Sequence, residues 1–151
     1  MVIAVEPRVG YEKIRLGMSR REALSCLGQP ASIETSSDGD ESWQYDDVQL
    51  SFLAEEDFKL SSITFFSSKY SLQGHQLVGR SVAELKLETS LGRLPKSRTR
   101  EDMEYLQAGT LEIPAMDCTL WIEDMNVTNF TIYPAYSDDG EEVIWPTKPT
   151  A

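Results

Sequence analysis

Apolar and polar residues alternate along two long stretches of the chain. In the first stretch Val48, Leu50 and Phe52 alternate with polar residues, and Trp43 and Tyr45 do the same just before them. Because successive side chains of a strand point to opposite faces of a sheet, this period of two predicts strands with one buried face. Polar turns separate the strands, as in an antiparallel β-meander. The predicted strands cover residues 43–45, 48–52 and 60–66.

A second stretch, from Glu104 to Tyr133, shows the same period. Leu120 and Ile122 alternate there with polar residues, as Leu50 and Phe52 do in the first stretch. The second stretch therefore predicts a second meander. Turn-forming residues divide it at Ala108-Gly109, Pro114 and Asp124 to Asn126.

Each stretch follows a Ser-x-x-Glu sequence, formed by Ser19 with Glu22 and by Ser81 with Glu84. At this spacing the serine side chain accepts a hydrogen bond from the third backbone N–H, and the glutamate reaches back to the serine N–H. Both sequences therefore predict the start of a helix. The first helix is expected from about Arg20 to Leu27, ended by Gly28 and Pro30, and the second is expected to end near Leu91, before Gly92 and Pro95.

Segments 17–24 and 79–86 align with each other, which indicates an internal repeat. Ala23, Leu24 and Leu27 give the first helix an apolar stripe for packing on the sheet. We therefore expect an α+β protein of two repeats, each a short helix followed by a meander, forming a curved sheet with the helices on one face. The expected units are residues 1–73, residues 74–136 and a partly mobile tail, 137–151, in which Val143 to Trp145 touch the body.

The first unit resembles a known family. The residues that carry the resemblance are Ile14 to Ser19, Leu27 to Pro30, Trp43 to Tyr45, Leu50-x-Phe52 and Lys59 to Ile63. They resemble the SmpA/OmlA small-lipoprotein domain, and the doubled form is similar to β-lactamase-inhibitor proteins, which are tandem repeats of that unit. The resemblance implies an exposed sheet face and loops that bind other proteins, with no catalytic residues. No lipid-attachment cysteine precedes the repeat and the inhibitors' disulfide cysteines are missing, so only the fold and its general use are carried over.

Charge narrows the choice of partners. The chain has 14 Lys and Arg against 25 Asp and Glu, a net charge of −11 at pH 7. Such a field repels nucleic acid and anionic lipid and favours basic proteins. The N-terminal segment lacks the features of a secretory signal, and no run has the length of a membrane span. We therefore expect a cytoplasmic protein with reduced, packed Cys26 and Cys118, and neither nucleic acid nor membrane as a partner.

Candidate enzyme chemistry finds little support. The only histidine, His75, lies in the glycine-containing joint between the units, so a nucleophile has no evident positioned base. One histidine and two separated cysteines give none of the usual metal spacings, and no glycine-rich phosphate loop is present. Paired acids could in principle serve glycosidase chemistry or Ca²⁺ binding, but each pair lies at a predicted turn. We expect no catalytic residues, no metal and no cofactor.

The acidic turns leave two main readings, solvated turns or an acidic rim that faces a partner. Trp121 is predicted on the outward face of its strand, opposite Leu120 and Ile122 and together with Gln49, Ser51 and Thr119. An aromatic side chain flanked by acids suits an interface anchor. The candidate partner-binding residues are Trp121, Glu123, Asp124, Asp46, Asp47, Glu55, Glu56 and Asp57.

These patterns favour an intracellular protein-binding module that neutralises or regulates a basic partner. A narrower hypothesis is an immunity protein that masks a cationic toxin, since an acidic rigid face steers fast association with a basic cleft. A scaffold subunit of an assembly is the alternative, and a small enzyme a more distant one. The sequence leaves the oligomeric state open.

Overall fold

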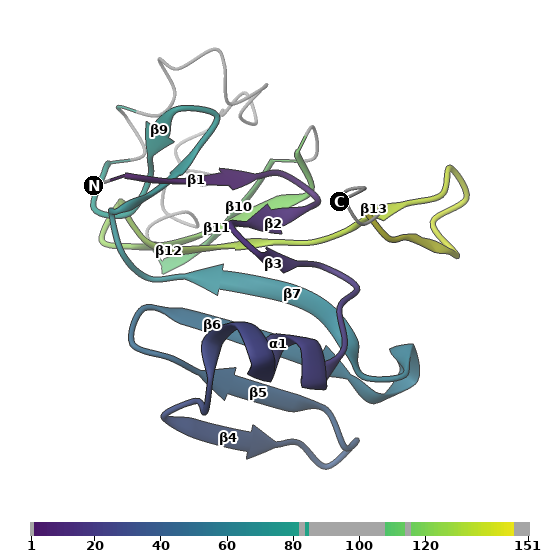
Figure 1. Cartoon of the computed structure of the whole chain (residues 1–151). Coiled ribbons are helices and arrows are strands. Elements are labelled where there is room, and N and C mark those ends of the chain that lie inside the picture. Colours follow the sequence, from purple (N-terminus) through teal and green to yellow (C-terminus); the bar gives the residue numbers. More distant parts are fainter. Residues whose placement is uncertain (1, 82–83, 85–107, 114–115, 147–151) are drawn as a thin grey trace.

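A computed structural model describes residues 2–81, 84, 108–113 and 116–146 (Figure 1). The described residues form one α-helix, a seven-stranded sheet, a five-stranded sheet and a two-stranded ribbon.

The larger sheet is antiparallel throughout, in the order β10-β11-β12-β7-β6-β5-β4. It contains a four-stranded meander, β4 to β7, and a three-stranded meander, β10 to β12, whose last strands pair in the middle, with Phe65 opposite Phe130 and Ile63 opposite Ile132. The bounds of these strands are β4 Ser32–Thr35, β5 Glu41–Gln44, β6 Val48–Leu53, β7 Lys59–Phe65, β10 Ala108–Ile113, β11 Cys118–Glu123 and β12 Asn126–Ile132.

The strands expected from the period of two are confirmed at β5, β6, β7, β11 and β12, whereas β4 was not predicted. The turn expected at Ala108-Gly109 is wrong, because both residues lie in β10 and pair with Glu123 and Ile122 of β11.

The smaller sheet has the order β3-β2-β1-β8-β9 and is built from segments that the sequence did not predict as strands. In this sheet the N-terminal strand β1 pairs in parallel with β8, with Ile3 opposite Tyr70 and Val5 opposite Leu72. The expected boundary at residue 73 falls in the turn between β8 and β9, and the division into units stays a prediction. The bounds are β1 Ile3–Glu6, β2 Gly10–Tyr11, β3 Ile14–Arg15, β8 Tyr70–Leu72 and β9 His75–Gln76.

Helix α1 (Arg20–Leu27) begins as predicted. Ser19 accepts a hydrogen bond from the Glu22 N–H at 3.1 Å, and the Glu22 side chain accepts one from the Ser19 N–H at 3.1 Å. This capping box satisfies two N–H groups that have no partner inside the helix. The helix ends at Gly28, whose φ of 76° is costly for residues with a Cβ.

The predicted apolar stripe of α1 is wrong at Leu24. Ala23 is fully buried and Leu27 half-buried, whereas Leu24 is 36% exposed. Residues four apart lie on the same face of a helix. This helix of eight residues packs on the sheet with the face that carries Ala23 and Leu27, so Leu24 lies at the edge of that face. At the second Ser-x-x-Glu sequence the Glu84 N–H donates to the Ser81 Oγ at 3.2 Å. The rest of that predicted helix lies outside the described residues.

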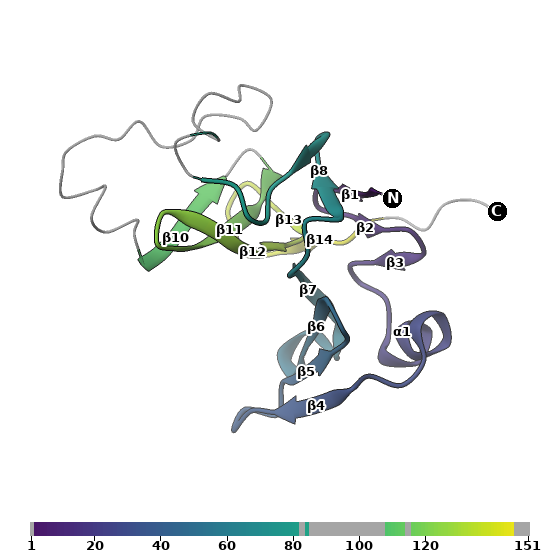
Figure 2. The same ribbon diagram turned by 90° about the vertical axis from the view of Figure 1, so that its left-hand side faces the viewer.

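The core lies between the larger sheet and the elements on one of its faces. Helix α1 and strands β1–β3 lie on the same side of β4–β7 (Figures 1 and 2). Leu50, Phe52, Phe65 and Phe130 are fully buried. The Phe65 ring stacks on Phe130 at 4.9 Å between centroids and contacts Tyr11 at 5.3 Å, which joins the two sheets.

The C-terminal segment forms a short ribbon of β13 (Ala135–Tyr136) and β14 (Val143–Ile144). The expected contact of Trp145 with the body is confirmed: its ring lies so close to Gly17 that a Cβ there would be 3.1 Å from it. Gly17 also has a φ of 92°, so the turn before α1 needs glycine for two reasons. Residues 147–151 lie outside the described part.

The predicted fold class, an α+β protein with helices packed on one face of a curved sheet, is wrong. The described chain is mostly β, with three sheets and a single α-helix. The error has a physical cause: strands of two to four residues are too short to show a period, and their pairing with β8 depends on contacts far apart in the sequence. None of the described helices is long and apolar enough to span a membrane.

Candidate functional site

The predicted binding residues fall into three separate groups. Trp121, Glu123 and Asp124 belong to β11 and the turn after it. Asp46 and Asp47 lie just before β6 and the acidic residues 55–57 just after it, so these two groups are at opposite ends of one strand. The structure therefore places acidic turns at both ends of the larger sheet.

Trp121 is held on the face of the larger sheet that points away from the core. Its side chain is 41% exposed, and its indole N–H donates to the Thr131 hydroxyl at 2.9 Å. The Thr131 hydroxyl in turn lies 2.7 Å from the Thr64 hydroxyl. These bonds cross β11, β12 and β7, so the indole is fixed in one orientation although much of it faces solvent.

A hollow of about 420 Å³ lies beside the indole. The register of β11 against β12 shifts between Trp121 and Ile122, and the Thr128 hydroxyl donates to the Trp121 carbonyl at 3.2 Å. Such a bulge re-aims side chains at a sheet surface. Glu123 is exposed and lines the hollow with Trp121, so these two predicted residues do come together. The other lining residues are Gly109, Thr110, Ile122, Thr128 and Asn129.

The rest of this face is polar. A row of register partners crosses six strands, from β4 to β11. We call this surface, together with Trp121, the polar face. Gln49 and Ser51 are half-buried on this face, and Thr119 lies on it as well by its pairing with Thr131, although only 4% of Thr119 is exposed. The row consists of Ser32, Gln44, Gln49, Thr64, Thr131 and Thr119.

The turn after β6 is a 3₁₀ helix, η1 (Ala54–Glu56), followed by Asp57 with a φ of 57°. Glu55 and Asp57 are exposed and Glu56 is half-buried. Burial, and then the charge of Glu55, raise the pKa of Glu56 above its ordinary value. This group belongs to a solvated turn at the end of the sheet opposite Asp46 and Asp47.

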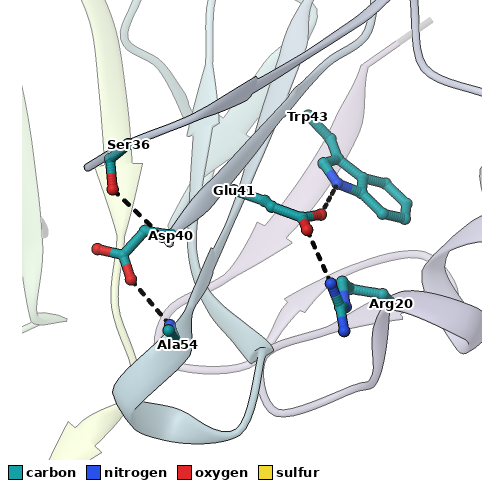
Figure 3. A network of polar contacts seen from close by, with 6 residues as sticks. All are labelled: Arg20, Ser36, Asp40, Glu41, Trp43 and Ala54. Carbon is teal, nitrogen blue, oxygen red and sulfur yellow. Dashed lines mark hydrogen bonds and ion pairs between the residues drawn. The ribbon is translucent and has the colours of Figure 1, made fainter. Parts of the chain in front are cut away.

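Two acids that the sequence did not single out hold this end of the sheet together (Figure 3). Asp40 accepts a hydrogen bond from the Ala54 N–H at 2.8 Å, while its own N–H donates to Ser36. Glu41 accepts from the Arg20 guanidinium at 2.8 Å and from the Trp43 indole at 2.9 Å. Both carboxylates serve the fold, since they tie α1 and η1 to the β4–β5 hairpin.

Asp46 and Asp47 line a cleft between the two sheets, with a volume of about 500 Å³. Asp47 forms an ion pair with Lys69 and accepts a hydrogen bond from the Tyr70 hydroxyl at 2.8 Å. Burial alone would raise the pKa of Asp47, but the hydrogen bonds from Lys69 and Tyr70 and the charge of Lys69 together lower it below its ordinary value. The pKa of Tyr70 is raised, first by burial and then by its hydrogen bond to the Asp47 carboxylate.

The two cysteines differ in their surroundings. No disulfide joins them; Cys118 is buried in β11 and Cys26 is exposed on α1, so the expected packing of Cys26 is wrong. Cys26 lies outside the helix face that carries Ala23 and Leu27, and it faces solvent. Across the described residues no group of three or more His, Cys, Asp and Glu side chains is placed to hold a metal ion.

Comparison with known proteins gives fold-level likeness only. No family model and no curated protein sequence matches the chain. A solved structure of an extracellular protein containing a SCP domain from Bacillus anthracis is similar with a TM-score of 0.56 and 15% identity, over 89% of this chain and 50% of that one. A cysteine-rich secretory protein from Staphylococcus aureus gives 0.49 and 12%, over 99% of this chain and 59% of that one. The chain thus spans about half the length of the Bacillus protein.

The Bacillus neighbour corrects three predictions. The resemblance to the SmpA/OmlA domain and to β-lactamase-inhibitor proteins, with its tandem repeat, is contradicted because the fold is similar to that of a protein containing a SCP domain. The cytoplasmic location is contradicted by the Bacillus neighbour, which is described as extracellular. The description of the chain as an inhibitor-like immunity protein lost its basis with that resemblance and that location.

Proposed function

We propose that this chain is a protein-binding module whose partner docks on the polar face, with Trp121 as the anchor. One observation carries the proposal: a large aromatic side chain is exposed, yet fixed by hydrogen bonds through Thr131 to Thr64. Tryptophan is among the residues that contribute most to protein interfaces. A side chain that is already ordered loses little entropy on binding, so more of its contact energy appears as affinity.

The surroundings of the anchor suit an interface core. The hollow beside the indole accepts a side chain from the partner, and the accessible polar residues that line it, Thr110, Thr128 and Asn129, offer donors and acceptors around it. An apolar anchor within polar surroundings is the usual composition of a non-obligate interface.

Charge points to a basic partner. The chain carries a net charge of −11, and Glu123 and Asp124 are exposed directly beside the anchor. Acidic groups at the edge of an interface speed association with a basic surface, while the buried aromatic slows dissociation. The immunity hypothesis is not retained, because it depended on the cytoplasmic location.

The test begins with a photo-crosslinking amino acid placed at position 121 and, as a control, at position 66. Phe66 is an aromatic residue of similar exposure, 38%, directly after β7. Proteins from the source organism that crosslink at position 121 and not at 66 are then purified, and their association and dissociation rates are measured.

For such a partner, Trp121→Ala should weaken binding by roughly 30-fold or more, mainly through faster dissociation. Glu123→Gln with Asp124→Asn should slow association at low salt and lose this effect at high salt. Phe66→Ala should leave both rates unchanged. Equal effects of Trp121→Ala and Phe66→Ala, or crosslinks at position 66 alone, would place the interface elsewhere.

A further inference from the structure

The cleft that contains Asp47 lies on the other side of the molecule's larger sheet from the polar face. It opens where the five-stranded sheet and the C-terminal end of α1 meet the β5–β6 turn. Three tyrosines line it together with aliphatic side chains and acids. Its lining residues include Tyr11, Glu12, Tyr45, Asp46, Lys69 and Tyr70.

Tyr11 is the unusual member of this lining. Its side chain is only 7% exposed, and its ring packs edge-on against Phe65 and Tyr70. The Tyr70 hydroxyl donates to Asp47 and the Tyr45 hydroxyl donates to the Gly28 carbonyl, each at 2.8 Å. For the Tyr11 hydroxyl, the described part of the chain offers no hydrogen-bond partner. A buried polar group in that state is uncommon, because it has lost water without replacement.

The Tyr11 hydroxyl is within electrostatic range of Glu12, Asp47 and Tyr45, which line the cleft together with Tyr11. Its pKa is raised, first by burial and then by the charges of Glu12 and Asp47, both of which line the same cleft. The phenol therefore stays protonated at neutral pH and offers one donor and two acceptor positions to a bound group.

The charges of the cleft favour a cation. Asp47 is already neutralised by Lys69, whose ammonium group also lies 5.3 Å from the centre of the Tyr70 ring. The cleft therefore already holds one cation of the chain, Lys69, between a carboxylate and an aromatic ring. Glu12 and Asp46 remain as exposed carboxylates at the opening, so the cleft keeps an excess of negative charge.

We propose that this cleft binds the guanidinium group of an arginine side chain presented by a protein or peptide. A guanidinium carries five N–H donors in a plane, which suits the Tyr11 hydroxyl together with the carboxylates of Glu12 and Asp46. Its flat face also packs on tyrosine rings. An arginine-bearing segment agrees with the basic partner of the proposed function, but the site rests on a different observation and a different face.

The experiment is an NMR titration of the whole chain with N-acetyl-arginine amide and with a short arginine-containing peptide. The same peptide with citrulline in place of arginine keeps the shape and removes the charge. Saturable shifts at Tyr11, Tyr45 and Tyr70 are expected with both arginine ligands, and the citrulline peptide should bind at least tenfold more weakly.

Tyr11→Phe removes only the hydroxyl and should weaken arginine binding roughly tenfold. Its thermal midpoint should not fall, because the hydroxyl has no partner to lose; a clear fall would show a hidden partner and overturn the argument. Glu12→Gln should also weaken binding, while Asp138→Asn, the same charge change in the exposed β13–β14 turn, should not. Equal affinity of Tyr11→Phe and wild type, or of the arginine and citrulline peptides, would disprove the site.

This outcome is independent of the interface at Trp121. Trp121→Ala should leave binding of N-acetyl-arginine amide unchanged, because the indole lies on the polar face. If arginine binding is lost in Tyr11→Phe while partner binding persists, the cleft site stands and the partner does not use it. If partner binding fails in Trp121→Ala while arginine binding persists, the two sites act separately.

Discussion

The two faces of the seven-stranded sheet differ in what their side chains do, and their two tryptophans show the difference. Trp43 lies on the face covered by α1, is 5% exposed, packs on Phe52 at 4.8 Å between centroids and donates to Glu41. Trp121 lies on the polar face, is 41% exposed and donates to Thr131. Both indole N–H groups donate a hydrogen bond of 2.9 Å. The two tryptophans therefore differ in whether other elements bury the ring, and not in hydrogen bonding.

With the proposed function, the difference means that stability and recognition are divided between alternate residues of the same strands. Leu50 and Phe52 of β6 are fully buried, while Gln49 and Ser51 between them are half-buried and polar. A change on the covered face should therefore act on the free energy of unfolding, and a change on the polar face on binding.

The largest expected effect tests the covered face. Phe52→Ala should lower the free energy of unfolding by about 3–5 kcal/mol, because it removes a fully buried ring and leaves a cavity. Ser51→Ala, the neighbour on the polar face, should stay within about 0.5 kcal/mol of wild type. Urea denaturation followed by circular dichroism measures both. Similar losses in the two variants would end the division between the faces.

A smaller effect is expected at the helix that covers this face. Ser19→Ala should cost about 1 kcal/mol, because the Glu22 N–H loses its capping partner. Ser25→Ala, an exposed change inside the same helix, is the control and should not destabilise, since alanine is the better helix former. An unchanged urea midpoint for Ser19→Ala would mean that the start of α1 contributes little to the stability of the fold.

The smallest effect concerns the ion pair that links the turn before β6 to β8. Since the pKa of Asp47 is lower in the folded chain, its contribution to stability is present above the unfolded value of about 3.9 and is lost as pH falls through the folded value. Below about pH 4 the wild type should therefore lose stability more steeply than Asp47→Asn, with Tyr70→Phe in between. Urea midpoints measured from pH 6 down to pH 2 decide this, and parallel curves for all three proteins would contradict the link.

Local patterns were enough to predict much of the larger sheet. The alternation of Val48, Leu50 and Phe52 defines β6 and its buried face, and the Ser19–Glu22 spacing defines the start of α1. Both signals act within a few residues, where side-chain direction and backbone hydrogen bonding are set by covalent geometry. The exposure of Trp121 followed from the same alternation.

The candidate sites were predicted only in part. Trp121 and Glu123 share one hollow, as neighbours two residues apart on a strand are expected to do. The acidic turns were expected to rim the outward face. Antiparallel strands place successive turns at opposite ends of the sheet, which separates Asp46 from Glu55, and their role in binding stays a prediction. Tyr11 gave no signal, since a single tyrosine between Gly10 and Glu12 looks like any exposed aromatic residue.

The sequence by itself determined which residues alternate and where α1 begins, because both depend on neighbours along the chain. It also determined that the chain is acidic, because net charge depends on composition alone. Only the tertiary structure decided that residues 3–15 form strands, since β1 finds its partner in β8, more than sixty residues away. The same long-range pairing buries Tyr11 against Phe65 and creates the cleft around Asp47. Contacts of this kind depend on which surfaces pack together, and no local period encodes that choice.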